Sequence, residues 1–166
     1  LVSEIRSQRD PLFGGCPPEP LAAHLQDLIT AVQTSSRNGQ PAVGLVFDGD
    51  GDRIAAVDEH GCFCSTQQLM PLLIDHLAGA RQLPGSVVKT VSGSDLMRLV
   101  AEDHGREVLE LPVGFKYIAA EMLAGDVLIG GEESGGVGFG MHLPERDALF
   151  AAMLVLEALV QGGMPL

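Results

Sequence analysis

Apolar residues along this chain follow two alternating patterns, helical spacing and short continuous runs. From residue 21 to about residue 34 the apolar positions fall three and four apart, which predicts an amphipathic helix. The apolar run AVGLVF at residues 42–47 then predicts a buried strand, and it stops at the acidic segment DGDGDR. The acidic segment therefore follows the carboxyl end of a strand.

Strand and helix patterns continue to alternate after that segment. IAAVDEHGCFCS predicts a hairpin of two short strands with a turn at Gly61. The later predicted elements are a helix at 67–77, a strand at 86–91, a helix at 94–104, a strand at 106–111, a helix at 115–123, a strand at 126–130 and a helix at 145–160. This order indicates an α/β fold, with a domain boundary near residues 64–67.

Composition restricts the classes of partner. The chain is 46% hydrophobic, which is enough for a core, and its net charge of −12 repels polyanions. We therefore exclude nucleic acids and anionic membrane surfaces as partners. No apolar stretch is long enough for a membrane span, and the N-terminus lacks a signal-peptide pattern. Three cysteines without a CxxC pair fit a reducing compartment, so we expect a cytoplasmic protein.

The acidic segment has the composition of a metal-binding loop. Asp48, Asp50 and Asp52 alternate with glycines, which allow three carboxylates to converge on one side. Hard oxygen ligands in that number suit Mg²⁺ or Ca²⁺. Unpaired carboxylates would repel one another, so we expect a cation or an arginine partner, for which Arg53 is nearest. A solvated acidic turn is the alternative.

Two other families of acidic loop fit this segment less well. An EF-hand would place Glu59 at its last ligand position, but it needs Gly where Arg53 stands and a helix where AVGLVF predicts a strand. A haloacid-dehalogenase-like phosphatase would use Asp48 as nucleophile and Asp50 as acid. That family has Thr or Val at the position of Asp52, and a third carboxylate would repel the phosphate.

A second loop and a lysine are further candidates. The segment GGEESGGVGFG at residues 130–140 is expected to lack regular structure, so its backbone can approach a ligand. Glu132 and Ser134 offer an acceptor and a hydroxyl suited to vicinal sugar hydroxyls, although a flexible connection is the alternative. Lys116 lies near a predicted helix start, where it could pair with a sugar phosphate. For His142 and Arg146 we expect surface or capping roles.

In this order, DGDGDR (48–53), PVGFKYI (112–118) and GEESGG (131–136) resemble the alpha-D-phosphohexomutase family of phosphoglucomutases, phosphomannomutases and phosphoglucosamine mutases. The likeness extends from DPLFGGCPPEP to the helix RDALFAAMLVLEAL. It implies that residues 1–65 are the C-terminal part of domain 2. Residues 66–166 would be domain 3, a small three-layer α/β/α domain with a mixed sheet.

The resemblance also implies a reaction, the reversible transfer of phosphate between the 1- and 6-positions of a hexose. In the family a phosphoserine, assisted by Mg²⁺, donates the phosphate, and the bisphosphate reorients before it returns its other phosphate. Asp48, Asp50 and Asp52 would hold Mg²⁺. The Mg²⁺ affinity of this chain is expected to be weak, on the order of millimolar, because the serine phosphate is a further ligand.

The remaining roles are implied in the same way. Arg53 would orient the phosphate, and Lys116 would assist proton transfer or charge balance. Glu132 and Ser134 would bind the sugar hydroxyls. Gly136 stands where other members carry His, which favours glucose phosphate, although several bacterial members accept mannose phosphate as well.

Two parts of the family's active site have no counterpart in this sequence. The phosphoserine loop of domain 1, of the Thr-Ala-Ser-His-Asn-Pro type, is absent, and Ser92 and Ser94 in TVSGSD look like helix caps. The phosphate clamp of domain 4 is absent too. We therefore expect a fragment that is inactive alone and whose partners are a hexose phosphate and domains 1 and 4. A stand-alone metal or sugar-phosphate binding module and the phosphatase remain the alternatives.

Overall fold

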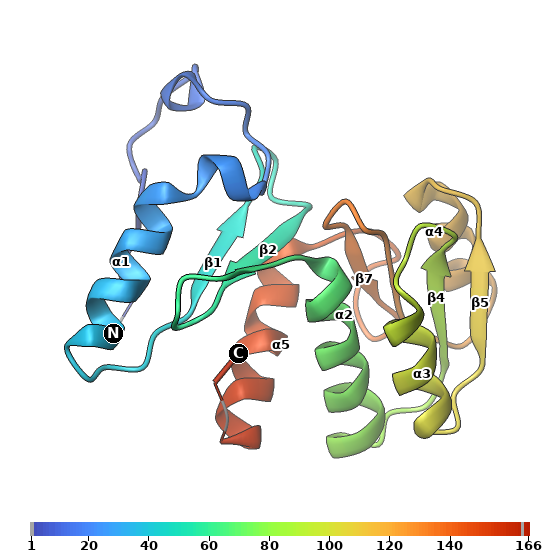
Figure 1. Cartoon of the computed structure of the whole chain (residues 1–166). Coiled ribbons are helices and arrows are strands. Elements are labelled where there is room, and N and C mark those ends of the chain that lie inside the picture. The colour runs from blue at the N-terminus through green and yellow to red at the C-terminus, as the bar shows by residue number, and fades with distance from the viewer. Residues whose placement is uncertain (1, 164) are drawn as a thin grey trace.

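Two sheets organise the residues that this computed structural model describes, 2–163 and 165–166 (Figure 1). The first is antiparallel, with the order β1-β2-β3. Its strands are β1 (Gly44–Phe47), β2 (Ile54–Val57) and β3 (Phe63–Cys64). The second is mixed, with the order β5-β4-β6-β7. Its strands are β4 (Ser86–Thr90), β5 (Val108–Leu111), β6 (Val127–Gly131) and β7 (Val137–Phe139).

Helices cover both faces of the mixed sheet. The α-helices are α1 (Gln26–Arg37), α2 (Thr66–Ile74), α3 (Asp95–Asp103), α4 (Phe115–Ala124) and α5 (Ala148–Gly162). Short helical segments are η1 (Phe13–Gly15), η2 (Ala22–His24) and the π-helix η3 (Asp75–Ala80). Along β4, Val87 packs with α2, α3 and α5, whereas Val88 packs with α4 on the other face. The three-layer α/β/α prediction is confirmed.

The handedness of the chain connections explains this layering. Strand β4 lies parallel to both β5 and β6 and is placed between them. The connection through α3 therefore moves toward one edge of the sheet, and the connection through α4 moves back toward the other. Because such crossovers are right-handed, opposite directions of travel place α3 and α4 on opposite faces.

One apolar cluster joins the two sheets. Ile54 and Ala56 of β2 are fully buried in the same cluster as Leu73 of α2 and Val155 of α5. Helix α5 lies beside α2 in Figure 1 and contacts both β1 and β2. This packing fixes the loop after β1 relative to the mixed sheet.

The element boundaries differ from the sequence prediction most clearly at three helices and in the glycine-rich segment. Helix α1 begins at Gln26 rather than residue 21, because residues 22–24 form a 3₁₀ turn. Helix α5 begins at residue 148, after the N-cap Asp147. Helix α2 continues as the π-helix to residue 80 instead of ending at 77. The prediction that residues 130–140 lack regular structure is wrong for 130–131 and 137–139, where β6 and β7 pair as Gly130↔Gly138, whereas residues 132–136 form the turn between these strands.

The described helices include none that is long and apolar enough to cross a bilayer. The predicted boundary near residues 64–67 falls between β3 and α2, and it stays a prediction.

Candidate functional site

The loop after β1 is built around the carboxylate of Asp48. This side chain is only 1% exposed. Its Oδ1 accepts the backbone N–H groups of Asp52 and Arg53 at 3.0 and 3.1 Å. Its Oδ2 accepts Nε of Arg53 at 2.6 Å. Gly51 adopts a φ of 76°, which closes the turn at no steric cost. Asp48 therefore holds the loop in shape, in addition to any role with a ligand.

The three carboxylates of this loop fit a hard divalent cation. Asp48, Asp50 and Asp52 each offer an oxygen within 4.8 Å of the others. Burial acts to raise the pKa of Asp48, but the hydrogen bonds from Arg53 and Asp52 lower it to about 2. Burial and the neighbouring Asp48 raise the pKa of Asp52, and Arg146 opposes that rise. Mutually repelling carboxylates at this spacing are a donor set that Mg²⁺ or Ca²⁺ would stabilise.

The glycine-rich segment forms a hairpin that docks on the acidic loop. Between β6 and β7 the chain turns tightly, and the N–H of Glu132 donates to the carbonyl of Gly136 at 2.9 Å. Gly135, with a φ of 112°, accepts the N–H of Ile54 at 3.0 Å. Arg53 pairs with Gly136 as an isolated β-bridge. Backbone contacts therefore place the glycine-rich hairpin directly beside the acidic loop.

Arg146 links the same two segments through its side chain. Its Nη2 forms an ion pair with Oδ2 of Asp52 at 2.5 Å, and its guanidinium lies 5.4 Å from the centre of the Phe115 ring. A Cβ at Gly136 would lie 2.5 Å from Cδ of Arg146, so the glycine leaves room for this side chain. Arg146 therefore links two segments and does not cap a helix, and its side chain remains 31% exposed. No local sequence signal indicates its partner, because Asp52 is distant in sequence.

His142 does support a helix cap, as expected. Its Nε2 lies 2.9 Å from Oδ2 of Asp147, the N-cap residue of α5. The imidazole also stacks on the ring of Phe150, with 4.3 Å between the ring centres.

Glu132 connects the hairpin to the lysine segment. It is 6% exposed, and its Oε1 accepts the N–H of Gly114, the N-cap residue of α4, at 2.8 Å. Lys116, in the first turn of α4, is exposed and places Nζ 4.9 Å from the centre of the Tyr117 ring. Ser134 is exposed at the turn of the hairpin. Glu132 thus joins the glycine hairpin to the lysine segment, although no hydrogen bond or ion pair links Lys116 to Glu132 or Ser134 among the described residues.

Sequence reasoning missed the role of Glu133. Its carboxylate accepts hydrogen bonds from Ser92, by a short contact, and from Thr90 at 3.2 Å. The bond from Ser92 lowers the pKa of Glu133. Ser94 caps α3 as predicted, since its Oγ accepts the N–H of Leu96 at 3.1 Å, but Ser92 contacts Glu133 instead of capping a helix. These contacts hold the carboxyl ends of β4 and β6 together.

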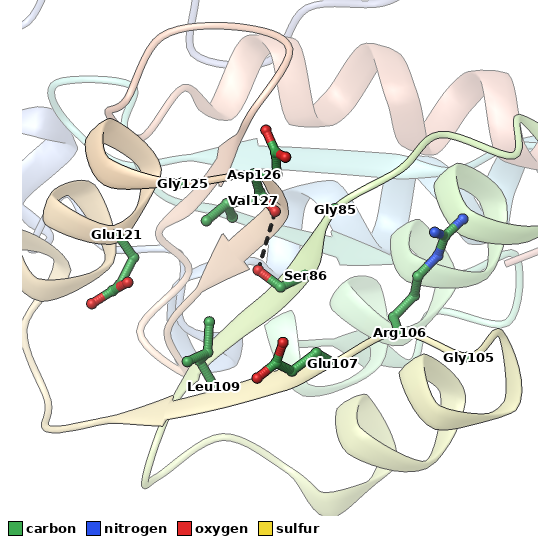
Figure 2. Close-up of a pocket in the computed structure, with 10 residues that line it drawn as sticks. All are labelled: Gly85, Ser86, Gly105, Arg106, Glu107, Leu109, Glu121, Gly125, Asp126 and Val127. Atoms are coloured by element: carbon green, nitrogen blue, oxygen red, sulfur yellow. Dashed lines mark hydrogen bonds between the residues drawn. The ribbon is translucent and has the colours of Figure 1, made fainter.

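A pocket of about 450 Å³ lies at the end of the mixed sheet where the parallel strands β4, β5 and β6 begin (Figure 2). It opens beside Ser86, at the amino end of β4, and Ser86 Oγ donates to the carbonyl of Asp126 at 3.2 Å. Glu107, Glu121 and Asp126 line it together with Arg106. Its acidic lining would repel a phosphate, and it is separate from the loops described above.

Family comparison places the two halves of the chain in consecutive domain models. Residues 65–166 match "Phosphoglucomutase/phosphomannomutase, alpha/beta/alpha domain III", and residues 1–61 match domain II of the same description.

Individual proteins of known family are also similar to most of this chain. A phosphoglucosamine mutase of Nitratidesulfovibrio vulgaris is 33% identical over 136 residues, which is 81% of this chain and 30% of that protein. A putative phosphomannomutase from Thermus thermophilus superposes with a TM-score of 0.88 at 37% identity, over 96% of this chain and 36% of that one. An Aspergillus fumigatus N-acetylphosphoglucosamine mutase, solved with GlcNAc-6P and magnesium, shares the fold, with a TM-score of 0.55 at 20% identity over 75% and 33%. The chain spans about a third of the length of these relatives.

Proposed function

Because this chain belongs to the phosphoglucomutase/phosphomannomutase family, we propose that it supplies the metal-binding and sugar-recognition loops of a phosphohexose mutase. Such an isomerase interconverts hexose 1-phosphate and hexose 6-phosphate. The observation that carries the proposal is the docking of the acidic loop on the glycine hairpin, through Arg53 and Gly136 and through Asp52 and Arg146. This contact supports the proposal that the two motifs contribute to one site.

Asp48, Asp50 and Asp52 are the proposed Mg²⁺ ligands. Their oxygens lie close enough to share one cation. When bound, the cation supplies positive charge that stabilises a transferring phosphoryl group. The magnesium in the A. fumigatus relative supports this choice of metal.

The other candidate residues would bind and orient the sugar phosphate. Arg53 already pairs with Asp48, and it would orient phosphate beside the metal loop. Glu132 uses Oε1 for Gly114 and would use Oε2 as an acceptor for a sugar hydroxyl, while the exposed Ser134 offers a second group. Lys116 would balance charge or move a proton at the sugar. We propose that Glu132 and Ser134 bind the sugar hydroxyls in both orientations of the sugar.

The proposed substrate is a hexose phosphate, with glucose or mannose as the hexose. The Thermus relative is described as a putative phosphomannomutase, which supports mannose, but the Nitratidesulfovibrio relative is a phosphoglucosamine mutase. The amino sugar is therefore included in the test below.

This chain alone is proposed to be inactive, because the phosphoserine loop and the phosphate clamp would come from domains 1 and 4. Binding without turnover follows, since the groups that position the reacting phosphate are incomplete. We propose a cytoplasmic location for the longer protein.

The test is ³¹P NMR of a protein that carries this chain with all four domains, supplied with Mg²⁺ and with glucose, mannose or glucosamine 1-phosphate in turn. We expect exchange to the 6-phosphate for at least one hexose, and its loss in Lys116→Ala and Glu132→Gln. Activity confined to the amino sugar would overturn the choice of glucose or mannose. No exchange with any of the three would reject the mutase proposal.

The phosphatase alternative requires Asp48 to attack phosphorus. Its carboxylate is almost completely buried and already accepts three hydrogen bonds, so it is poorly placed as a nucleophile. This alternative predicts release of inorganic phosphate by the 166-residue chain alone, lost in Asp48→Asn. We expect no release from any sugar phosphate.

A further inference from the structure

Arg146 and Asp52 come from different parts of the chain. Asp52 belongs to the loop between β1 and β2, whereas Arg146 lies just before α5, beyond the glycine hairpin. Their ion pair at 2.5 Å is accompanied by a backbone contact between the same segments, in which Ala148 N–H donates to the carbonyl of Gly51 at 3.1 Å. The amino end of α5 therefore packs against the loop that holds the three carboxylates.

The surroundings of Arg146 restrict its side chain. Its guanidinium lies over the Phe115 ring, its Nε is 3.4 Å from Oε1 of Glu145, and the absence of a Cβ at Gly136 makes room for its stem. With these contacts the side chain is about one-third exposed, and it reaches a carboxylate that is 19% exposed. Such contacts on several sides favour one orientation of the Arg146 guanidinium group.

Asp48 and Asp52 are thus held by two different arginines. Arg53 holds Asp48 at 2.6 Å from within the acidic loop, and its Nε is 3.8 Å from Oδ1 of Asp52. Arg146 holds the other oxygen of Asp52, Oδ2. With both arginines in place, all three aspartates still offer oxygens within 4.8 Å of one another. The arginines are therefore compatible with a converging set of ligands.

We propose that Arg146 is a positioning residue for the cation site, which holds Asp52 so that its carboxylate converges with Asp48 and Asp50. The inference rests on the proposed function, because it takes these aspartates as the ligands. A carboxylate fixed by an outer partner does not have to be ordered when the cation binds. Without Arg146, repulsion from the two neighbouring carboxylates would turn Asp52 toward solvent.

Removal of the positive charge of Arg146 would by itself strengthen cation binding. A cation near Arg146 feels its repulsion, so a purely electrostatic role predicts tighter binding when the arginine is removed. The positioning role predicts weaker binding. The sign of the change separates the two, and Arg146→Lys separates geometry from charge because it preserves the charge.

The experiment is a titration of the ¹⁵N-labelled 166-residue chain with Mg²⁺ alone, followed through the amide signals of residues 48–53. We expect Arg146→Gln to weaken binding about tenfold, the low end of what outer-shell partners contribute, and Arg146→Lys to restore part of the loss. The control Arg98→Gln removes the same charge from exposed pairs with Asp95 and Glu102 on α3, and it should change the affinity less than about twofold.

The outcomes are distinct. If the wild-type chain shows no saturable Mg²⁺ shifts in residues 48–53, the proposed metal loop itself fails. If the wild type binds and Arg146→Gln binds as tightly or more tightly, only the positioning role fails. If Arg146→Gln loses its dispersed amide spectrum and so does not fold, the Mg²⁺ affinities of Arg146→Lys and Arg98→Lys are compared instead. The inference requires Arg146→Lys to bind Mg²⁺ more weakly than Arg98→Lys, and equal affinities overturn it.

Discussion

The buried carboxylate of Glu132 accepts the backbone N–H of Gly114 at 2.8 Å and so ties the glycine hairpin to the start of α4. The bond satisfies one of the N–H groups that a helix start leaves without an intrahelical partner. It also fixes the distance between the two segments that carry Glu132 and Lys116. The same side chain therefore serves the fold and is a candidate sugar ligand.

Glu132→Ala is expected to destabilise the chain by about 1–3 kcal/mol, because it leaves the Gly114 N–H without its acceptor in a partly buried setting. Glu132→Gln retains an oxygen acceptor and should lose less than half of that amount. Urea unfolding at neutral pH measures both. Equal losses for the two variants would mean that the Gly114 bond does not account for the stability of this junction.

Gly135 is expected to be more sensitive than an exposed glycine to the addition of a side chain. Its φ of 112° disfavours any other residue, and a Cβ would lie 3.0 Å from the carbonyl oxygen of Ile54. Gly105 is a matched control, since it has a φ of 65° but no atom within 4 Å of the added carbon. Gly105→Ala should cost about 1–2 kcal/mol through backbone strain alone.

Gly135→Ala should cost about 1–3 kcal/mol more than that control, because the contact with the acidic loop must open as well. Urea unfolding compares the two variants, and the amide signals of residues 48–53 should shift only for Gly135→Ala. If the two glycines respond alike, the close docking of hairpin and loop is not supported.

Local patterns were sufficient to predict most of the elements. The run AVGLVF predicted a strand at residues 42–47, and β1 begins at Gly44 and ends at Phe47 as predicted. The alternation of strands and helices predicted the layers, because each element buries its own apolar face. The strand β7 was missed because glycines are poor strand formers.

The structure explains Gly138 in β7 and Gly140 just after it by packing and not by flexibility. A Cβ at Gly138 would lie 2.8 Å from the ring of Phe115, and one at Gly140 would overlap the carbonyl of Val127. The pairing of Asp52 with Arg146 also could not be predicted from the sequence. It depends on how α5 packs against the acidic loop, and no local pattern encodes that arrangement.

The three aspartates of the acidic loop are expected to differ in what they contribute to stability. Asp50 is exposed, and among the described residues no hydrogen bond reaches its side chain, whereas Asp48 accepts three. Asp50→Asn should therefore weaken Mg²⁺ binding and leave the free energy of unfolding unchanged or slightly higher, since it removes repulsion.

Asp48→Asn should weaken Mg²⁺ binding and also destabilise the chain by about 1–3 kcal/mol, because the bond from Arg53 loses its ionic partner. Amide titration and urea unfolding report the two quantities separately. Asp103→Asn, an exposed change of the same charge at the end of α3, is the control and should affect neither. A Mg²⁺ affinity of Asp50→Asn equal to that of the control would remove Asp50 from the ligand set.

Asp147 is expected to make the stability of α5 depend on pH. Its Oδ1 accepts the N–H of Phe150 at 2.9 Å, and this bond, with the contact from His142, lowers its pKa below the ordinary value of 3.8. A carboxyl with a lowered folded pKa stabilises the fold above its unfolded pKa, and this contribution is lost as the pH falls through the folded value.

Asp147→Asn retains a capping oxygen but cannot ionise. The difference in free energy of unfolding between wild type and this variant should therefore shrink as the pH falls below about 4. Urea unfolding from neutral pH down to the acid limit of the fold measures it. A difference that stays constant through this range would show that the ionised carboxylate is not what stabilises the start of α5, and that its capping oxygen alone is sufficient.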